Sequence, residues 1–233
     1  MTQKDAIRFE TPLYTVPEAA RFLGVPATTF ATWAHGYERR PSGRQAVRGE
    51  PILTAVKTPP RHPEIPFVGL VEGMVAAAFR RSGVSMQHMR RALQVLDNEI
   101  GIEHALASRQ LYTDGASILF DYASAEGDDE VLTVVVTGQR VFHEIIRDYL
   151  KRITYGTDDW AERMALPITE RLVVECDPTR GFGRPLFIRG GAPMDDVLDR
   201  FRAGEPLREV ARDFDLRPDD VEDVIRASLP QAA

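Results

Sequence analysis

Two short predicted helices joined by a glycine turn constrain this chain more than any other feature. Thr15-Val-Pro-Glu18 is a capping box with a proline in the first helical turn, so a helix begins there. Apolar residues at helical spacing follow, and Gly24-Val25-Pro26 combines the residue types that end one helix and start another. The second helix spans residues 27–35 and ends at Gly36. This is the helix-turn-helix arrangement, whose second helix can enter the major groove of DNA.

An arginine-rich segment follows the second helix. Residues 37–56 begin with turn-forming and basic residues and continue with alternating apolar ones, a pattern that predicts a β-hairpin wing. Arginines at its tip would contact phosphates or the minor groove, which positions a protein on DNA without specifying the sequence. The predicted DNA-binding residues are Thr28, Thr29, Thr32 and His35 on the helix and Arg39, Arg40, Arg44 and Arg48 on the wing.

The charge distribution also indicates that DNA binding would involve the amino-terminal end of the chain. The whole chain has a net charge of -6, but residues 1–62 hold nine lysines and arginines against five acidic residues, a net of +4. Residues 175–233 hold nine arginines against thirteen acidic residues, a net of -4. Only the first segment would therefore attract a phosphate backbone by its net field.

We expect three domains and an α+β fold that is mainly helical. The proline-dense stretch from residue 59 to 66 predicts a boundary, and the expected domains are residues 1–62, 63–170 and 171–233. The central domain would begin with two paired helices, at 67–81 and 85–100, the second carrying Arg90 and Arg91 on its outer face. The expected buried stripe of the first of these helices consists of Leu70, Val71, Met74, Val75, Ala78 and Phe79.

The residue pattern in the rest of the central domain predicts a small antiparallel sheet and one more helix. Residues 110–113, 117–122 and 131–136 are rich in strand-forming residues and are separated by turn signals. Residues 139–153 return to helical spacing and would serve the core or a dimer interface. The carboxy-terminal domain is expected to hold a hairpin over 172–193 and three short helices at 194–202, 206–214 and 218–229.

No residue pattern indicates a catalytic or metal site. The acidic run from residue 128 to 130 is interpreted as a solvated loop, and His88, His104 and His143 have no second histidine at ligand spacing. The single cysteine, Cys176, excludes an intramolecular disulfide and a zinc site with several thiolates. We therefore expect no enzyme activity, no metal and no cofactor, with a nuclease that uses the scattered acidic residues as the enzymatic alternative.

The same composition indicates the cytoplasm. The amino terminus carries charges where a signal peptide needs an apolar core, and no stretch approaches the roughly 18 apolar residues of a membrane helix. We expect a cytoplasmic protein without a membrane partner.

Residues 14–33, Tyr-Thr-Val-Pro-Glu-Ala-Ala-Arg-Phe-Leu-Gly-Val-Pro-Ala-Thr-Thr-Phe-Ala-Thr-Trp, resemble the winged helix-turn-helix head of the MerR-like and excisionase-like regulators. The resemblance covers about fifty residues. It implies DNA binding, although the same helices would also suit a small structural or protein-binding domain. A metal sensor of the MerR type is not implied, because the ligand cysteines are absent.

The carboxy-terminal segment resembles the antitoxin-type domain known as domain of unknown function 433, a hairpin followed by a trihelical helix-turn-helix. The matching residues are Asp177-Pro178, Gly183-Arg184-Pro185, Ile188-Arg189-Gly190 and the run from Ala203-Gly204 through Asp220-Val221. The chain departs from the family pattern at Gly191-Ala192, where a polar and a basic residue are usual. With the acidic net charge, this departure makes the amino-terminal unit the expected DNA reader.

Long members of this family with an amino-terminal helix-turn-helix resemble the VapB-type antitoxins. The resemblance implies an antitoxin that neutralises a PIN-domain ribonuclease toxin and represses its own operon by binding promoter DNA as a homodimer. Arg180, Arg184 and Arg189 are the predicted partner-binding residues, with solvation of the hairpin as the other interpretation. The alternative function is a MerR-like transcriptional regulator that senses a small ligand in the middle sheet and has no toxin partner.

Overall fold

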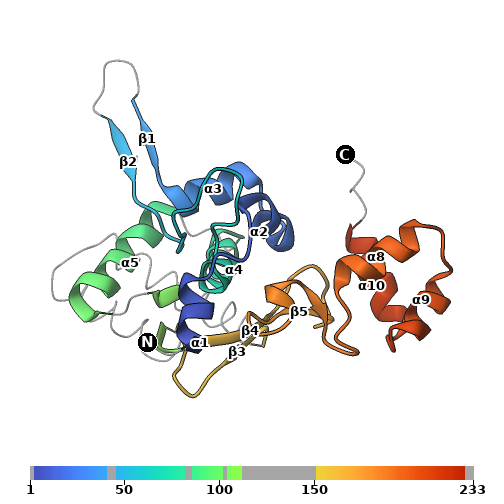
Figure 1. Cartoon of the computed structure of the whole chain (residues 1–233). Helices are drawn as coiled ribbons and strands as arrows, with labels where there is room; N and C mark the ends of the chain where they lie inside the picture. Colours follow the sequence, from blue (N-terminus) through green and yellow to red (C-terminus); the bar gives the residue numbers. More distant parts are fainter. Residues whose placement is uncertain (1–2, 41–45, 82–85, 102–103, 112–150, 229–233) are drawn as a thin grey trace.

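The computed structural model describes residues 3–40, 46–81, 86–101, 104–111 and 151–228, and helices dominate it (Figure 1). The predicted fold class, α+β and mainly helical, is confirmed. In chain order the elements are α1 (Gln3–Asp5), η1 (Ala6–Glu10), α2 (Val16–Leu23), α3 (Ala27–His35), β1 (Tyr37–Arg39), β2 (Val47–Gly49), α4 (Phe67–Arg81), α5 (Met86–Ile100), η2 (Ala105–Ala107), β3 (Ile153–Tyr155), β4 (Ala161–Ala165), β5 (Val174–Cys176), η4 (Gly181–Gly183), β6 (Leu186–Phe187), α8 (Met194–Arg202), α9 (Leu207–Asp213) and α10 (Pro218–Ser228).

Helices α2 and α3 form as the capping signals predict. Both halves of the capping box are present: the Glu18 amide donates to the Thr15 hydroxyl, and the Thr15 amide donates to the Glu18 carboxylate at 2.8 Å. Gly24 ends α2 in the left-handed conformation, with φ of 63°. The predicted wing is also present, because β1 pairs antiparallel with β2 and places Tyr37 opposite Gly49.

Helix α4 is the centre of the larger core. Every residue from 67 to 79 is buried, so the predicted one-sided stripe is too narrow. The reason is that α2, α3, η1, η2 and β4 all pack against this helix. Two glycines permit the close approach: a Cβ on Gly69 would lie 2.2 Å from the Thr54 carbonyl oxygen, and one on Gly73 would lie 2.6 Å from the Phe30 ring.

The core crosses both predicted domain boundaries. Helix α4 lies beyond the boundary at residue 62 yet packs on α2 and α3, which precede it. Strand β4 precedes the boundary at residue 170 and pairs with β5, which follows it. The division into three domains remains a prediction, and the described residues on either side of each boundary share hydrophobic packing.

A four-stranded antiparallel sheet, in the order β3-β4-β5-β6, connects the two ends of the molecule. The predicted carboxy-terminal hairpin is its β5–β6 half, with Val174 opposite Phe187. Strands β3 and β4 are missing from the sequence prediction, and Ile153, predicted to end a helix, begins β3 and pairs with Met164. Its position is set by this long-range pairing and not by local helical spacing.

Most of the sheet predicted for the central domain lies outside the described residues, as does most of the helix predicted from residue 139 to 153. Gln110 and Leu111, the described beginning of the first predicted strand, are helical. The Leu111 side chain is buried in the main hydrophobic core, and this packing, rather than pairing with a neighbouring strand, accounts for its apolar character.

The amino-terminal helical segment is absent from the sequence prediction, and a buried arginine fixes it to the sheet. Arg8 is 1% exposed and donates to the carboxylates of Asp5 at 2.7 Å and Asp158 at 2.5 Å. Desolvation lowers the pKa of Arg8, but the bonds to Asp158 and Asp5 outweigh it and the pKa is raised. The hydrogen bond from Arg8 lowers the pKa of Asp158.

The carboxy-terminal helices α8, α9 and α10 follow the sequence prediction within one residue at each end. Their shared core is small and aliphatic, with Val197, Val210 and Val224 fully buried. Arg200 binds the carboxylates of Glu205 and Asp213 and lies over the Phe214 ring, 5.4 Å from its centroid. These hydrogen bonds raise the pKa of Arg200 and lower those of both carboxyl groups.

Candidate nucleic-acid interface

Helix α3 buries an aromatic face and leaves a small polar face outside. Phe30 and Trp33 are buried against the core, as their spacing predicts. Thr28 is exposed, and Thr29 and Thr32 are half-buried. The Thr32 hydroxyl donates to the Thr28 carbonyl at 2.8 Å, which leaves the Thr32 methyl group and hydroxyl lone pairs for other contacts. The first turn of α3 contains no acidic residue, so nothing there repels a phosphate.

The wing projects away from the helices, as Figure 1 shows. At its described part Arg40 donates to the Glu38 carboxylate at 2.7 Å and Arg48 donates to it at 3.1 Å. The side chains of Arg40 and Arg48 are 77% and 69% exposed, so both ion pairs are solvated and weak. One carboxylate therefore balances two arginines that remain open to phosphate. Arg39 lies in β1, and Arg44 lies outside the described residues.

A residue predicted to lie on an outer helix face supports the base of the wing. Arg90 of α5 donates from Nε to the Glu50 carbonyl at 2.7 Å, and its guanidinium lies over the Tyr37 ring, 5.2 Å from the centroid. The helical spacing that put Arg90 outside does not reveal the hairpin packed above it. Arg90 is predicted only to lie on the outer face of its helix, and the structure places the base of the wing against that side chain.

Two glycines make the base of the wing tight. Gly36 ends α3 with φ of 72°, and a Cβ there would lie 2.4 Å from the Gly49 carbonyl oxygen. A Cβ on Gly49 would lie 2.3 Å from the Tyr37 ring. Larger residues at either position would force the hairpin away from α3. The wing is thus held at a fixed angle to the helix that is predicted to read DNA.

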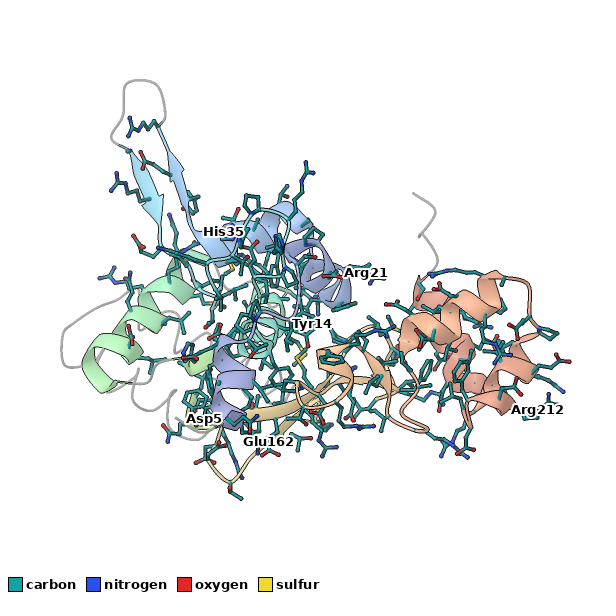
Figure 2. The ribbon with its side chains drawn as sticks, in the orientation of Figure 1. Asp5, Tyr14, Arg21, His35, Glu162 and Arg212 are labelled. Carbon is teal, nitrogen blue, oxygen red and sulfur yellow. The ribbon has the colours of Figure 1, made fainter. Side chains whose placement is uncertain are left out.

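His35 joins the end of α3 to the segment that follows the wing. Its Nε2 atom lies 3.0 Å from a Glu64 carboxylate oxygen, and Figure 2 shows its side chain beside the base of the wing. The Trp33 carbonyl accepts from the Ile52 amide at 2.8 Å, a second bond between α3 and this segment. His35 is half-exposed and already has an acidic partner, so a phosphate would compete with Glu64 for it.

Two of the positive charges counted for the first segment do not lie at this interface. Arg8 is buried among acidic partners, and Lys4 forms an ion pair with Glu162 of β4. Figure 2 shows Asp5 and Glu162 on the sheet side of the molecule, away from the wing. Arg21, by contrast, points outward from α2, and its guanidinium lies over the Phe22 ring, 5.0 Å from the ring centroid. The net charge of +4 therefore overstates the field that DNA would meet.

The predicted partner-binding arginines lie around the β5–β6 hairpin, in the sheet between the head and the carboxy-terminal helices (Figure 1). Arg180 pairs with Glu175 at 3.3 Å, and Arg184 pairs with Asp196 at 2.8 Å. Arg189 donates to the Asp215 carbonyl at 3.0 Å. Each arginine side chain remains about half exposed, between 46% and 50%, so an incoming carboxylate could reach all three.

Tyr14 connects the helix-turn-helix head with this hairpin. Its hydroxyl donates to the Gly183 carbonyl at 2.8 Å, and Figure 2 shows it between the head and the sheet. Burial raises the pKa of Tyr14 well above its usual value and raises the pKa of the neighbouring Cys176 thiol to about 12. Local sequence patterns indicate no role for Tyr14, because its acceptor is 169 positions away.

Metal-ligand clusters and membrane-spanning helices can be assessed only for the described parts of the chain. There, no group of three or more histidine, cysteine, aspartate or glutamate residues is arranged to hold a metal ion. Among the same residues, no helix is both long enough and apolar enough to cross a membrane.

Comparison with known families agrees with the architecture. Residues 12–93 match the family described as "Putative DNA-binding HTH domain", a match that runs from the head through α4 into α5. Residues 174–226 match the family described as "Protein of unknown function (DUF433)". The chain is therefore a helix-turn-helix protein of the class that carries a domain of unknown function 433 at its carboxy-terminal end.

Full-length relatives narrow this class. The chain is 45% identical to the "Putative antitoxin VapB45" of Mycobacterium tuberculosis over 97% of both chains, and it belongs to the family of that protein. A second relative from the same organism, "Uncharacterized protein Rv2308", is 24% identical and aligns with 91% of this chain and 88% of its own. The crystal structure of Rv2018 from M. tuberculosis superposes with a TM-score of 0.78, at 38% identity, covering 94% of this chain and 99% of that one.

Proposed function

We propose that this protein is the antitoxin of a type II toxin–antitoxin pair, which neutralises a PIN-domain ribonuclease toxin and represses its own operon by binding promoter DNA. The observation that carries the proposal is that two basic features lie on different elements: the wing projects from the head beside α3, whereas the arginine-bearing hairpin belongs to the sheet between the head and the carboxy-terminal helices (Figure 1). Two separate surfaces suit a protein that binds DNA and a partner protein simultaneously.

The DNA-binding half of the proposal rests on helix α3 and the wing. Thr28, Thr29, Thr32 and His35 would face base edges and phosphates in the major groove. Arg39, Arg40, Arg44 and Arg48 would hold the backbone beside it, and Arg90 would fix the wing at its base. A homodimer would place two such heads on a symmetric promoter.

The partner-binding half rests on the half-exposed arginines of the hairpin. A PIN-type ribonuclease has an acidic catalytic cleft, and guanidinium groups bind carboxylates well. Arg184 and Arg189 would exchange their exposed acidic partners for those of the toxin, and Arg180 would bind with the half of its side chain that is exposed beside the buried Glu175. This role requires no catalysis, metal or cofactor in the antitoxin itself.

Co-expression with the product of the adjacent reading frame tests both halves. The expected result is a stable complex, loss of the ribonuclease activity of the partner on complex formation, and a shift of promoter DNA by the antitoxin alone. A chain that shifts promoter DNA but neither binds nor inhibits that product would overturn the antitoxin proposal.

One structural observation favours the alternative, a regulator that senses a small ligand. A pocket of about 340 Å³ lies below the wing and is lined in part by Arg90, Glu72 and His104. Glu72 is 3% exposed and accepts from the Thr54 amide at 2.6 Å, so a buried carboxylate lies at a polar cavity. Promoter affinity that changes on addition of a cell metabolite extract, in the absence of any partner protein, would support this alternative.

A further inference from the structure

The hairpin displays a phenylalanine that contributes almost nothing to the core of this chain. Phe182 is 90% exposed, whereas the other large exposed apolar residues in the described regions, Leu172 and Ile188, are 46% and 43% exposed. Phe182 also has a left-handed backbone, with φ of 56° and ψ of 36°, which is disfavoured for a residue with a bulky side chain. Neither feature helps this chain to fold, so both call for another explanation.

The loop that holds Phe182 is well fixed. At its start the Asp177 carboxylate, only 6% exposed, accepts from the Thr179 amide at 2.8 Å and from its hydroxyl at 2.6 Å. At its end the Gly183 amide donates to the Arg180 carbonyl at 3.0 Å, and the Gly183 carbonyl accepts from Tyr14. A Cβ on Gly183 would lie 2.8 Å from both Leu13 and Tyr14 atoms, so the loop rests directly on the head. A ring presented by a fixed loop loses little conformational entropy on binding.

The loop is also a basic island in an acidic unit. Residues 178–194 contain three arginines and no aspartate or glutamate, although residues 175–233 together have a net charge of -4. Arg180 and Arg184 stand two positions to either side of Phe182. The ion pair of Arg184 with Asp196 is at the surface, where such pairs contribute little and exchange readily. Arg180 is half exposed, although its partner Glu175 is buried.

We propose that Phe182 is the anchor by which this chain binds its partner protein, inserting into an apolar socket whose rim is acidic. Aromatic and arginine side chains dominate the binding energy of protein interfaces, typically with an apolar residue at the centre and polar ones around it. Phe182 supplies the centre, and Arg180 and Arg184 meet carboxylates of the rim. The inference rests on the proposed antitoxin function and names the residue on which partner binding depends.

The experiment is a titration of the full-length chain with the purified product of the adjacent reading frame, measured by isothermal calorimetry. Phe182→Ala is expected to raise the dissociation constant by at least about 30-fold, as for a strong interface anchor. Phe182→Tyr keeps the ring and is expected to stay within about 3-fold of the wild type. Leu172→Ala is the matched control, because it removes a half-exposed apolar side chain outside the arginine loop, and it is expected to leave affinity unchanged.

Phe182→Gly separates binding from folding. Glycine adopts a left-handed backbone without strain, so this variant is expected to melt at or near the wild-type temperature and still to lose partner affinity. Promoter binding by Phe182→Ala is expected to equal that of the wild type, since the wing lies elsewhere (Figure 1).

The three ways in which the experiment can fail are distinct. If the wild-type chain does not bind the adjacent product, the proposed antitoxin function is overturned. If it binds and Phe182→Ala binds equally well, the anchor is overturned while the antitoxin function stands. If sedimentation shows that Phe182→Ala instead dissociates a homodimer of this chain, the socket belongs to a second copy and the inference is also wrong.

Discussion

The head and the carboxy-terminal unit are both helical, and helix α3 of the head differs from α8 and α10 in the residues that begin the helix. In the head, α3 begins with Ala27-Thr28-Thr29 and has no acidic residue in its first turn. In the carboxy-terminal unit, α8 carries Asp195 and Asp196 in its first turn, and α10 carries Asp219 and Asp220. A helix amino terminus carries a partial positive charge, which can stabilise either an internal carboxylate or an external phosphate.

The arginines of the two units also differ in how many acidic residues of the chain surround them. In the carboxy-terminal unit they bind acidic residues of that unit, as Arg200 binds Glu205 and Asp213 and Arg171 binds Asp223. In the wing, Arg40 and Arg48 share the single carboxylate of Glu38. In the carboxy-terminal unit, carboxylates of the chain itself thus occupy the starts of α8 and α10 and pair with its arginines, whereas the start of α3 carries no carboxylate.

Removing the wing arginines is expected to have the largest effect on promoter binding. Changing Arg39, Arg40, Arg44 and Arg48 to alanine should weaken promoter binding on the order of 10³-fold at low salt. It should also flatten the salt dependence, by about one unit of slope for each phosphate that is no longer neutralised. Fluorescence anisotropy over a series of salt concentrations measures both quantities.

The matched control removes the same charge from the other unit. Alanine at Arg202, Arg208, Arg212 and Arg226, all exposed, should leave affinity and slope nearly unchanged. Equal losses from the two quadruple variants would show that net charge, and not the wing, governs binding.

Giving α3 the acidic start of the carboxy-terminal helices is expected to have the next largest effect. Thr28→Asp combined with Thr29→Asp should weaken promoter binding on the order of 10²-fold, because two carboxylates would face the phosphates. The helix itself should be as stable as before or more so, by about 0.3–1 kcal/mol per charge. Promoter shift and thermal melting are measured on the same preparation, and Thr28→Ser with Thr29→Ser is the control. Retained binding would mean that α3 does not approach DNA.

Tyr14→Phe tests whether the two units unfold together. The change leaves the buried Gly183 carbonyl without its donor, so the free energy of unfolding should fall by about 1–2 kcal/mol. Urea unfolding is followed by tryptophan fluorescence, which reports on the head and central core, and by far-ultraviolet circular dichroism. Two well-separated transitions in the wild type would contradict the view that the head and the hairpin form one cooperative unit.

The smallest expected effect is a dependence of stability on alkaline pH that originates beside the Tyr14 hydroxyl. Because burial raises the pKa of Cys176 to about 12 in the folded chain, its thiol is protonated there at pH values where the unfolded chain, with a pKa of about 8.5, has begun to ionise. The ionisation of Cys176 therefore leaves the free energy of unfolding unchanged below about pH 8.5 and lowers it as the pH rises from there toward 12. The free energy of unfolding should fall by less than about 1 kcal/mol between pH 8 and pH 9. Cys176→Ala should lack this part of the slope, and an identical slope in both proteins would remove Cys176 as its cause.

The features that the sequence predicted well are local. The capping box at Thr15, the left-handed Gly24 and the glycine at the end of α3 each determine a helix end through neighbouring residues, so their consequences can be derived from the printed order. The three carboxy-terminal helices follow their apolar spacing for the same reason. At the candidate interface, local signals also predicted the paired strands of the wing.

The features that local patterns do not predict depend on partners far along the chain. In the sequence, Arg8 resembles an ordinary surface cation. Its partner Asp158, whose carboxylate lies 2.5 Å from the guanidinium, is 150 positions away along the chain. Arg90 lies on the predicted outer face of its helix, and its contact with Tyr37 of the wing is not visible in the local sequence. Strands β3 and β4 are three and five residues long, and what defines them is their pairing with each other and with β5. Local periodicity carries no information on such pairings.

The bond between Tyr14 and Gly183 also limits how such a protein can be recombined during evolution or in the laboratory. A chimaera that joins this head to a foreign carboxy-terminal unit would inherit a buried hydroxyl without its acceptor. The reciprocal exchange would leave the hairpin carbonyl without its donor. Successful exchange would therefore have to move residue 14 together with the loop at residue 183, so the inherited block includes positions from both ends of the chain.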